Sequence, residues 1–207
     1  MGRYTGSVCK QCRREKTKLY LKGERCDSNS CSMDRRGYPP GEHGRRRVRE
    51  SDYLLQIREK QKARRVYGVR ERQFRTYYKQ ALKQKGRTGE NLLRLLESRL
   101  DNMVYRAGLA ASRKQARQLV SHGHVTVNER KVDIGSYQVK EGDVIGVAPG
   151  SKKLDVFKEA TRGFRREQVP WLNVDLKNLA ATVIEKPDGY NPDVEIRDEM
   201  IVELYSR

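Results

Sequence analysis

The sequence predicts an α+β fold in which a mostly helical body carries a small inserted α/β module and a polar amino-terminal extension. Three observations support this prediction. Apolar residues recur at helical spacing from residue 51 to residue 108, and they alternate with polar residues from residue 123 to residue 147. All four cysteines of the 207-residue chain also fall between residues 9 and 31, before the first helical segment.

The cysteine pattern of the extension indicates a metal site. Two, thirteen and four residues separate the successive cysteines, which are Cys9, Cys12, Cys26 and Cys31. Four thiolates can close a tetrahedral shell around zinc, and such a shell leaves no position for a reacting water. We expect structural zinc on these residues. An iron–sulfur cluster on the same thiolates is the alternative metal centre, and disulfides or free thiols are the third interpretation.

Basic neighbours of the cysteines are expected to lower the pKa of the thiols; they are Lys10, Arg13, Arg14 and Lys16. A metal on the thiolates would clamp a segment that is too polar to fold alone. An arginine-rich linker with Pro and Gly residues follows the last cysteine. The metal-clamped extension and this basic linker are predicted to span residues 1–44.

Three helices are predicted in the body, which is assigned to residues 45–96, and at its border. The first begins after Ser51, a favoured N-cap residue, and ends at Gly68. The second covers residues 71–85. The third runs without a break from residue 88 to residue 108 and shows the strongest helical periodicity in the chain.

The inserted module is predicted over residues 97–160. Ser112 and Gln115 form a capping box that starts a short helix. Residues 123–132 alternate around a turn, and residues 144–147 have the character of a further strand, so a small sheet is expected.

The last part of the chain, residues 161–207, is expected to pack back on the helical body. A helix-prone piece begins near Leu154, before this segment. A final strand is predicted at residues 201–205, where apolar and β-branched residues gather.

Charge is distributed unevenly along the chain. Lys and Arg number 45 against 27 Asp and Glu, a net charge of +18. Residues 1–50 carry 14 basic and 6 acidic side chains, residues 51–120 carry 18 and 6, and residues 121–207 carry 13 and 15. Crowded cations repel one another, and nucleic-acid phosphates would offset that repulsion. The first 120 residues are therefore expected to bind a nucleic acid.

Several other function classes lack the sequence features that they need. An RNA-modifying enzyme or a synthetase would require a catalytic domain, and the motifs G-x-x-x-x-G-K-[ST], G-x-G-x-x-G and H-E-x-x-H do not occur. A zinc-finger regulator of DNA would need a recognition helix, which the polar segment between Cys12 and Cys26 does not offer. No run approaches the roughly 18 apolar residues of a membrane span. The three histidines, His43, His122 and His124, are expected in RNA contacts or loop packing rather than in catalysis.

Three segments of the module resemble a known family of RNA-binding modules. Residues 98–106, 112–120 and 123–128 are similar to the module shared by bacterial ribosomal protein S-four, tyrosyl-tRNA synthetases and some pseudouridine synthases. The rest of the chain resembles the small-subunit ribosomal protein S-four family alone. This wider resemblance rests on the Arg3-Tyr4-Thr5-Gly6 start, the four cysteines, residues 38–44, 58–62 and 67–68, and the Leu204-Tyr205-Ser206-Arg207 end.

The resemblance implies a structural, cytoplasmic protein of the small ribosomal subunit, not an enzyme. It implies direct binding to small-subunit ribosomal RNA at a multi-helix junction and nucleation of subunit-body assembly. It further implies a contact with a neighbouring small-subunit protein that affects decoding accuracy. Some relatives bind their own messenger RNA, which is therefore a further candidate partner. No membrane partner is expected.

The residues expected to contact RNA lie within the first 131 positions. They are mostly Lys and Arg, with two histidines and one asparagine from the module: Arg3, Lys10, Arg13, Arg14, Arg35, Arg36, Arg45, Arg46, Arg47, Arg58, Lys60, Lys62, Arg64, Arg65, Arg70, Arg72, Arg113, Lys114, Arg117, His122, His124, Asn128, Arg130 and Lys131.

Overall fold

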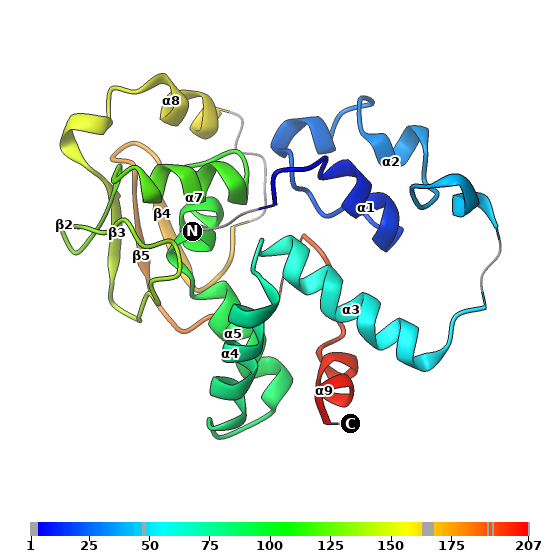
Figure 1. The fold of residues 1–207 in the computed structure, drawn as a ribbon. Coiled ribbons are helices and arrows are strands. Elements are labelled where there is room, and N and C mark those ends of the chain that lie inside the picture. The colour runs from blue at the N-terminus through cyan, green and yellow to red at the C-terminus, as the bar shows by residue number, and fades with distance from the viewer. Residues whose placement is uncertain (1–3, 47–48, 163–167, 190, 192, 207) are drawn as a thin grey trace. The chain divides into compact units, whose positions relative to one another are not determined.

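The structure is a computed structural model that describes residues 4–46, 49–162, 168–189, 191 and 193–206 (Figure 1). It divides into two compact units. Unit 1 comprises Met1–Leu92 and Asp193–Arg207, and unit 2 comprises Leu93–Pro192. The chain thus leaves unit 1, builds unit 2 and returns. The predicted α+β class, a helical body with a small antiparallel sheet, is confirmed.

Unit 1 is helical. Its elements are α1 (Cys9–Glu15), η1 (Gly23–Cys26), α2 (Ser32–Arg35), η2 (Glu42–Arg45), α3 (Asp52–Val66), α4 (Glu71–Leu82), the first half of α5 (Thr88–Glu97) and α9 (Asp198–Ser206). Ser51 caps α3 as predicted, since its Oγ accepts a hydrogen bond from the backbone N of Leu54 at 3.3 Å. Gly68 adopts a φ of 62°, which turns the chain between α3 and α4.

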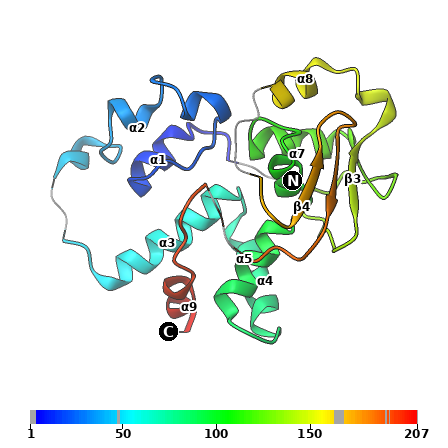
Figure 2. The ribbon, with the colours of Figure 1, turned by 180° about the vertical axis from the view of Figure 1, so that it is seen from behind.

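The prediction of a carboxy-terminal strand was wrong. The segment Ile201–Tyr205 lies inside α9, which contacts α3 in unit 1, and both ribbon views show the two helices together (Figure 2). Its apolar residues also fit helical spacing, because Ile201, Leu204 and Tyr205 share one face. Asp198 and Glu199 stand in the first turn, where the helix dipole favours negative charge.

Unit 2 combines short helices with one sheet. Its elements are the second half of α5, α6 (Leu100–Arg106), α7 (Arg113–Ser121), β1 (Val125–Val127), β2 (Arg130–Lys131), β3 (Val144–Val147), η3 (Pro149–Ser151), α8 (Asp155–Arg162), β4 (Leu172–Asp175) and β5 (Ala180–Val183). The strands pair antiparallel in the order β2-β1-β3-β5-β4.

The last two strands change the predicted domain plan. Strand β5 pairs with β3, with Ile145 opposite Ala181, so residues 172–183 extend the sheet of the module. The expectation that all of residues 161–207 returns to the helical body therefore does not fit the two units. Only the part from Asp193 onward belongs to unit 1.

The third predicted helix is split in two by strand-like backbone pairing. The backbone N–H groups of Leu100 and Asp101 donate to the carbonyl oxygens of Tyr137 and Gly135, at 2.9 and 3.1 Å. Because these donors are used outside the helix, α5 ends before Arg99 and α6 begins after it. The apolar spacing continues through the break, which is why the sequence shows one helix.

The core of unit 2 fixes the position of α7. Alternate residues of β1, β3 and β5, such as Val125, Ile145 and Ala181, form one buried cluster with Ala116 and Val120 of α7. The predicted cap is present, because Ser112 Oγ accepts a hydrogen bond from the backbone N of Gln115. One side of α7 therefore packs on the sheet.

Candidate nucleic-acid interface

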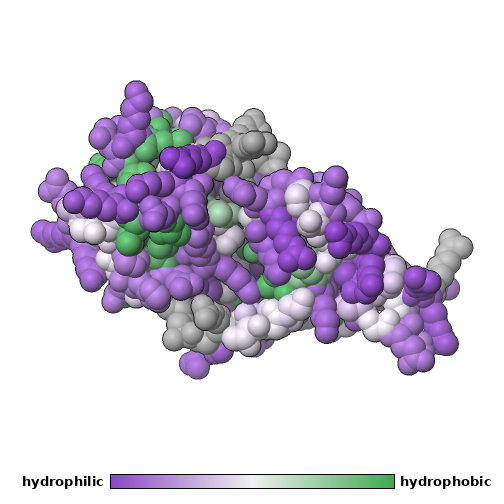
Figure 3. Space-filling view, turned by 90° about the horizontal axis from the view of Figure 1, so that it is seen from above, coloured by the Kyte–Doolittle hydropathy of each residue, from purple (hydrophilic) through white to green (hydrophobic). Residues whose placement is uncertain are grey.

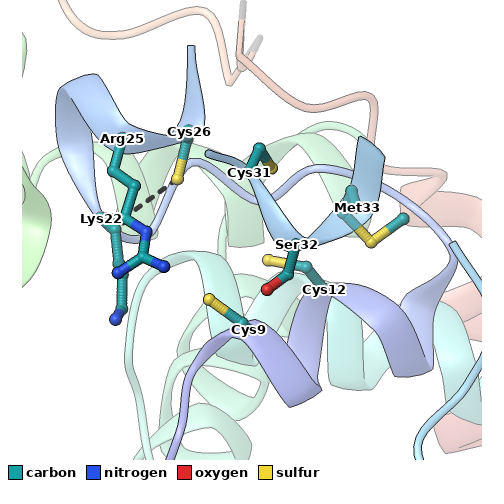
Figure 4. A pocket seen from close by; sticks show the side chains of 8 residues that line it. All are labelled: Cys9, Cys12, Lys22, Arg25, Cys26, Cys31, Ser32 and Met33. Carbon is teal, nitrogen blue, oxygen red and sulfur yellow. Dashed lines mark hydrogen bonds between the residues drawn. The ribbon is translucent and has the colours of Figure 1, made fainter. Parts of the chain in front are cut away.

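The four cysteines lie around one small pocket of unit 1. Cys9 and Cys12 come from α1, Cys26 ends η1, and Cys31 precedes α2 (Figure 4). All four are free thiols, and three of them are buried. The pocket has a cavity volume of about 20 Å³. Within the described residues, no group of three or more Cys, His, Asp and Glu side chains is arranged to hold a metal ion.

At Cys12 and Cys26 the pKa of the thiol is raised, which is opposite to the lowering expected from the sequence. Burial is the largest cause at Cys12 and, with smaller contributions from the other three cysteines, raises its pKa to about 11, although a backbone hydrogen bond from Leu19 acts in the opposite direction. Burial also raises the pKa of Cys26, although the backbone N of Lys22 donates a hydrogen bond to its Sγ at 3.3 Å. At both thiols the effect of burial exceeds that of the backbone hydrogen bond, which acts in the opposite direction.

Arginine side chains of α1 donate hydrogen bonds to the backbone of the arginine linker and hold the linker against the helix. Arg13 Nε donates to the carbonyl oxygen of Tyr38 at 3.0 Å, and Arg14 donates to that of Pro40 at 3.2 Å. The guanidinium groups of Arg13 and Arg45 lie 5.1 and 4.8 Å from the ring centroid of Tyr38. Arg13 and Arg45 thus help to order the linker.

Cations of α3 that were predicted to contact RNA are paired inside unit 1. Arg58 and Arg65 both form ion pairs with Glu15, whose side chain is 1% exposed. Burial raises the pKa of Glu15, and the charges of Arg65 and Arg58 act against that rise. Lys62 pairs with Glu59 at 2.6 Å. These side chains connect α3 to α1 and to itself.

Glu71 at the start of α4 gathers three partners from the rest of unit 1. Lys60 and Arg64 of α3 pair with its carboxylate at 3.0 and 2.9 Å, and the hydroxyl of Tyr205 in α9 donates to it at 3.0 Å. Burial alone would raise the pKa of Glu71, but the hydrogen bonds from Lys60 and Tyr205 lower it overall. Burial and the Glu71 charge raise the pKa of Tyr205.

The two arginines of α7 point inward to a polar network. Arg113 is buried, donates to Asn102 Oδ1 at 2.8 Å and lies 4.2 Å from the ring centroid of Tyr105. Arg117 pairs with Asp101 at 2.8 Å. The same Asp101 accepts two hydrogen bonds from the fully buried Arg99, at 3.0 and 2.7 Å. Arg113 and Arg117 were predicted as phosphate ligands. In the structure, both side chains contact other residues of unit 2 instead.

A second buried pair extends this network. Arg106 contacts both carboxylate oxygens of Glu97, at 3.0 and 2.9 Å, and neither side chain is more than 3% exposed. Asn102 donates to Glu97 Oε2 at 2.7 Å and accepts from Arg113. The network therefore joins α5, α6 and α7.

Two other predicted contacts in the module have structural partners. Asn128 has a φ of 49° and bridges to β3, because its Nδ2 donates to Asp143 and its Oδ1 accepts from the backbone N of Val144, both at 2.8 Å. His124 Nδ1 lies 2.9 Å from Ser151 Oγ, which connects η3 to the residue that precedes β1. The His122 ring lies 6.1 Å from that of His124.

Of the other residues predicted to contact RNA, some lie outside the described residues and most are exposed. Arg3 and Arg47 lie outside the described residues. Exposed predicted side chains are found on both units: Lys10, Arg14, Arg35, Arg36, Arg45, Arg46, Arg70, Arg72, Lys114, His122, Asn128, Arg130 and Lys131. The space-filling view shows a largely hydrophilic face with separate hydrophobic areas (Figure 3).

The sequence prediction missed exposed cations on α4, at its C-cap and beyond η3. Arg75, Lys79 and Lys83 are exposed, as are Lys152 and Lys153. The signal for the first three was available, because they stand opposite the apolar stripe of α4 at helical spacing. Together, the fold and the exposed cations define a nucleic-acid-binding protein.

Comparison with known proteins identifies the family. Residues 3–97 match the ribosomal protein S4/S9 N-terminal domain, and residues 98–145 match the S4 domain. The chain is 57% identical over 209 residues to small ribosomal subunit protein uS4 of Acidothermus cellulolyticus, and 56% identical over 210 residues to that of Acetivibrio thermocellus. It is 52% identical over 209 residues to that of Thermus thermophilus, and each comparison covers 100% of both chains. The chain therefore belongs to the small ribosomal subunit protein uS4 family, which confirms the resemblance seen in its sequence.

No helix in the described part of the chain is both long enough and apolar enough to cross a membrane.

Proposed function

We propose that this chain is a structural protein of the cytoplasmic small ribosomal subunit and binds small-subunit ribosomal RNA directly. This proposal rests mainly on one observation: carboxylates are paired inside the two units, whereas many cations are exposed on their surfaces. Carboxylates such as Glu15, Glu97 and Asp101 are used inside the two units. Exposed Lys and Arg remain on both units. Phosphates would neutralise this surface excess, and family membership supports ribosomal RNA as their source.

The proposed contact reads RNA shape more than base sequence. Structured RNA offers phosphates and 2′-hydroxyl groups across its minor groove, and its deep major groove is closed to side chains. Cations on two separate compact units suit a folded junction of several RNA helices, because each unit can contact a different helix. Binding of this kind would fix the junction and nucleate assembly of the subunit body.

The near-neutral last third of the chain supports a protein partner. Residues 121–207 carry 15 acidic and 13 basic side chains, and Glu185, Asp188 and Glu195 are exposed. We propose that this part contacts a neighbouring small-subunit protein and that the contact contributes to translational accuracy. Messenger RNA is a further proposed partner, since it offers the same phosphates to the same cations.

Reconstitution tests the proposed function. Small-subunit ribosomal RNA is mixed with the other small-subunit proteins, with or without this chain, and the particles are separated by sedimentation. We expect complete particles that contain the chain only when it is added. Particles of equal yield and equal sedimentation without it, or particles that exclude it, would contradict the proposal.

We also propose that Cys9, Cys12, Cys26 and Cys31 hold one structural zinc ion. The donor set supports this, because four free thiols, two from α1, one from η1 and one from the N-cap of α2, line one pocket. A cavity of about 20 Å³ holds roughly one water-sized sphere, which favours a single ion over a cluster. The thiols would have to approach one another more closely to share the ion. Zinc would supply no catalysis here; it would hold the extension together.

Metal analysis of protein purified without oxygen separates the two metal centres. We expect about one zinc per chain and no visible absorption, because four thiolates close one tetrahedral shell. Iron with sulfide and a visible absorption band would contradict the zinc proposal and support the iron–sulfur cluster instead. Protein that binds neither would overturn the metal proposal and leave free thiols.

A further inference from the structure

One face of α4, together with its C-cap residue Lys83, carries a row of cations. Arg72, Arg75, Lys79 and Lys83 follow one another at intervals of three, four and four residues, and all are exposed. At 1.5 Å of rise per residue, these intervals are about 4.5–6 Å along the helix axis. Thr76 and Gln80, which stand beside them, are exposed and neutral. The four cations thus form a row, here called the α4 row.

The opposite face of α4 fixes the direction of the α4 row. Phe74, Tyr77, Tyr78 and Ala81 are buried. The ring of Tyr205 in α9 stacks on Tyr78 with 4.4 Å between centroids. These buried residues and the α4 row lie on opposite sides of the helix, which has about 3.6 residues per turn. Because the buried side faces the interior of unit 1, the α4 row faces away from it.

The α4 row differs from the cations of α3 because none of its four side chains forms an ion pair with a described residue. No Asp or Glu occurs between Arg72 and Gly89 in the sequence. Glu71, at the start of the helix, is already shared by Lys60, Arg64 and Tyr205. The four cations repel one another, and the carboxylate one turn before Arg75, that of Glu71, is already paired with Lys60 and Arg64.

We infer that the α4 row binds the phosphate backbone of RNA, with one phosphate for each of its four cations. This inference rests on the proposed function and assigns part of the binding energy to Arg75, Lys79 and Lys83, which were not among the expected RNA contacts, together with Arg72, which was. Four cations in line, with Leu82 as the exposed apolar neighbour at the end of the helix, suit a repeating anion more than an apolar protein surface. The α4 row therefore contributes affinity without base preference.

The test measures how RNA binding by the full chain depends on salt. A transcript of small-subunit ribosomal RNA is titrated with the wild-type protein and with Arg72→Gln, Arg75→Gln, Lys79→Gln and Lys83→Gln combined. The control variant removes the same charge elsewhere, by Lys140→Gln, Lys177→Gln, Lys186→Gln and Arg197→Gln, which are exposed positions. Circular dichroism and thermal unfolding show that both variants fold.

Four lost phosphate contacts should reduce the slope of log K against log salt by about 2.8 to 3.6, at 0.7 to 0.9 for each contact. The control variant should change the slope by less than one contact. Equal changes in the two variants would overturn the α4 row as a phosphate site while leaving the proposed function intact. If the wild type binds an unrelated transcript as tightly, yet only the α4 variant loses slope, the row stands and the proposed function fails. No measurable RNA binding by the wild type overturns both.

Discussion

At the scale of single residues, neighbours of the same charge have different environments in this chain. Arg113 is buried against Asn102 and Tyr105, whereas Lys114 beside it is exposed. The sequence shows the sign of each side chain but not the distant carboxylate that meets it, since Asp101 and Arg117 are sixteen positions apart. This is why the candidate interface could be predicted as a region and not residue by residue.

Removing the carboxylate of Asp101 should destabilise unit 2. In an Asp101→Ala variant, Arg99 and Arg117 lose the carboxylate that both now contact. Breaking such a buried pair costs about 3–5 kcal/mol. Urea unfolding followed by the fluorescence of Trp171, the only tryptophan and a buried residue of unit 2, measures this loss. Gln118→Ala, an exposed change on α7, is the control, and a loss as small as that of the control would contradict the role of Asp101.

At the scale of elements, apolar periodicity and caps predicted most helices, but not what the backbone does between them. Ser51 and Ser112 cap α3 and α7 as predicted. The break at Arg99 depends on carbonyl groups from residues 135 and 137, which no local pattern reveals. The apolar run at residues 201–205 fits a strand as well as a helix. Its packing against α3 favours the helix α9.

The contacts of Tyr205 should stabilise unit 1 in two separable parts. Tyr205→Phe removes the hydrogen bond to Glu71 and should cost about 1 kcal/mol. Tyr205→Ala also removes the stacking on Tyr78 and should cost more, about 2–3 kcal/mol for a half-buried ring. Hydrogen exchange of α3 amides measures both losses, with Ser206→Ala as the control. Equal protection in all three variants would show that α9 does not hold unit 1 together.

The cysteines should hold the extension and not the rest of the chain. A Cys9→Ser, Cys12→Ser variant should lose bound zinc and become disordered over residues 1–35, because Cys12, Gly23 and Cys26 are the only buried residues of α1 and η1. Limited proteolysis and metal content measure the two effects. Ser30→Ala, a change between the second pair of cysteines, serves as the control. If Trp171 became exposed when the extension became disordered, the cysteines would stabilise the whole fold and not the extension alone.

At the scale of the whole molecule, strand pairing decided the boundaries that the sequence left open. Residues 172–183 carry weak alternation, and they form strands because β3 offers them an edge. Their place in the sheet makes unit 2 larger than predicted and leaves a short return to unit 1. The uneven charge along the chain, by contrast, needs no fold to be seen.

The central claim is that this charge binds ribosomal RNA, and an equilibrium comparison tests it most directly. The full chain is titrated against a folded small-subunit ribosomal RNA transcript and against duplex DNA with the same number of phosphates, at one physiological salt concentration. The account predicts binding to the ribosomal transcript that is tighter by about a thousandfold, the lower range of specific over non-specific recognition. Equal affinity for the two nucleic acids would contradict it.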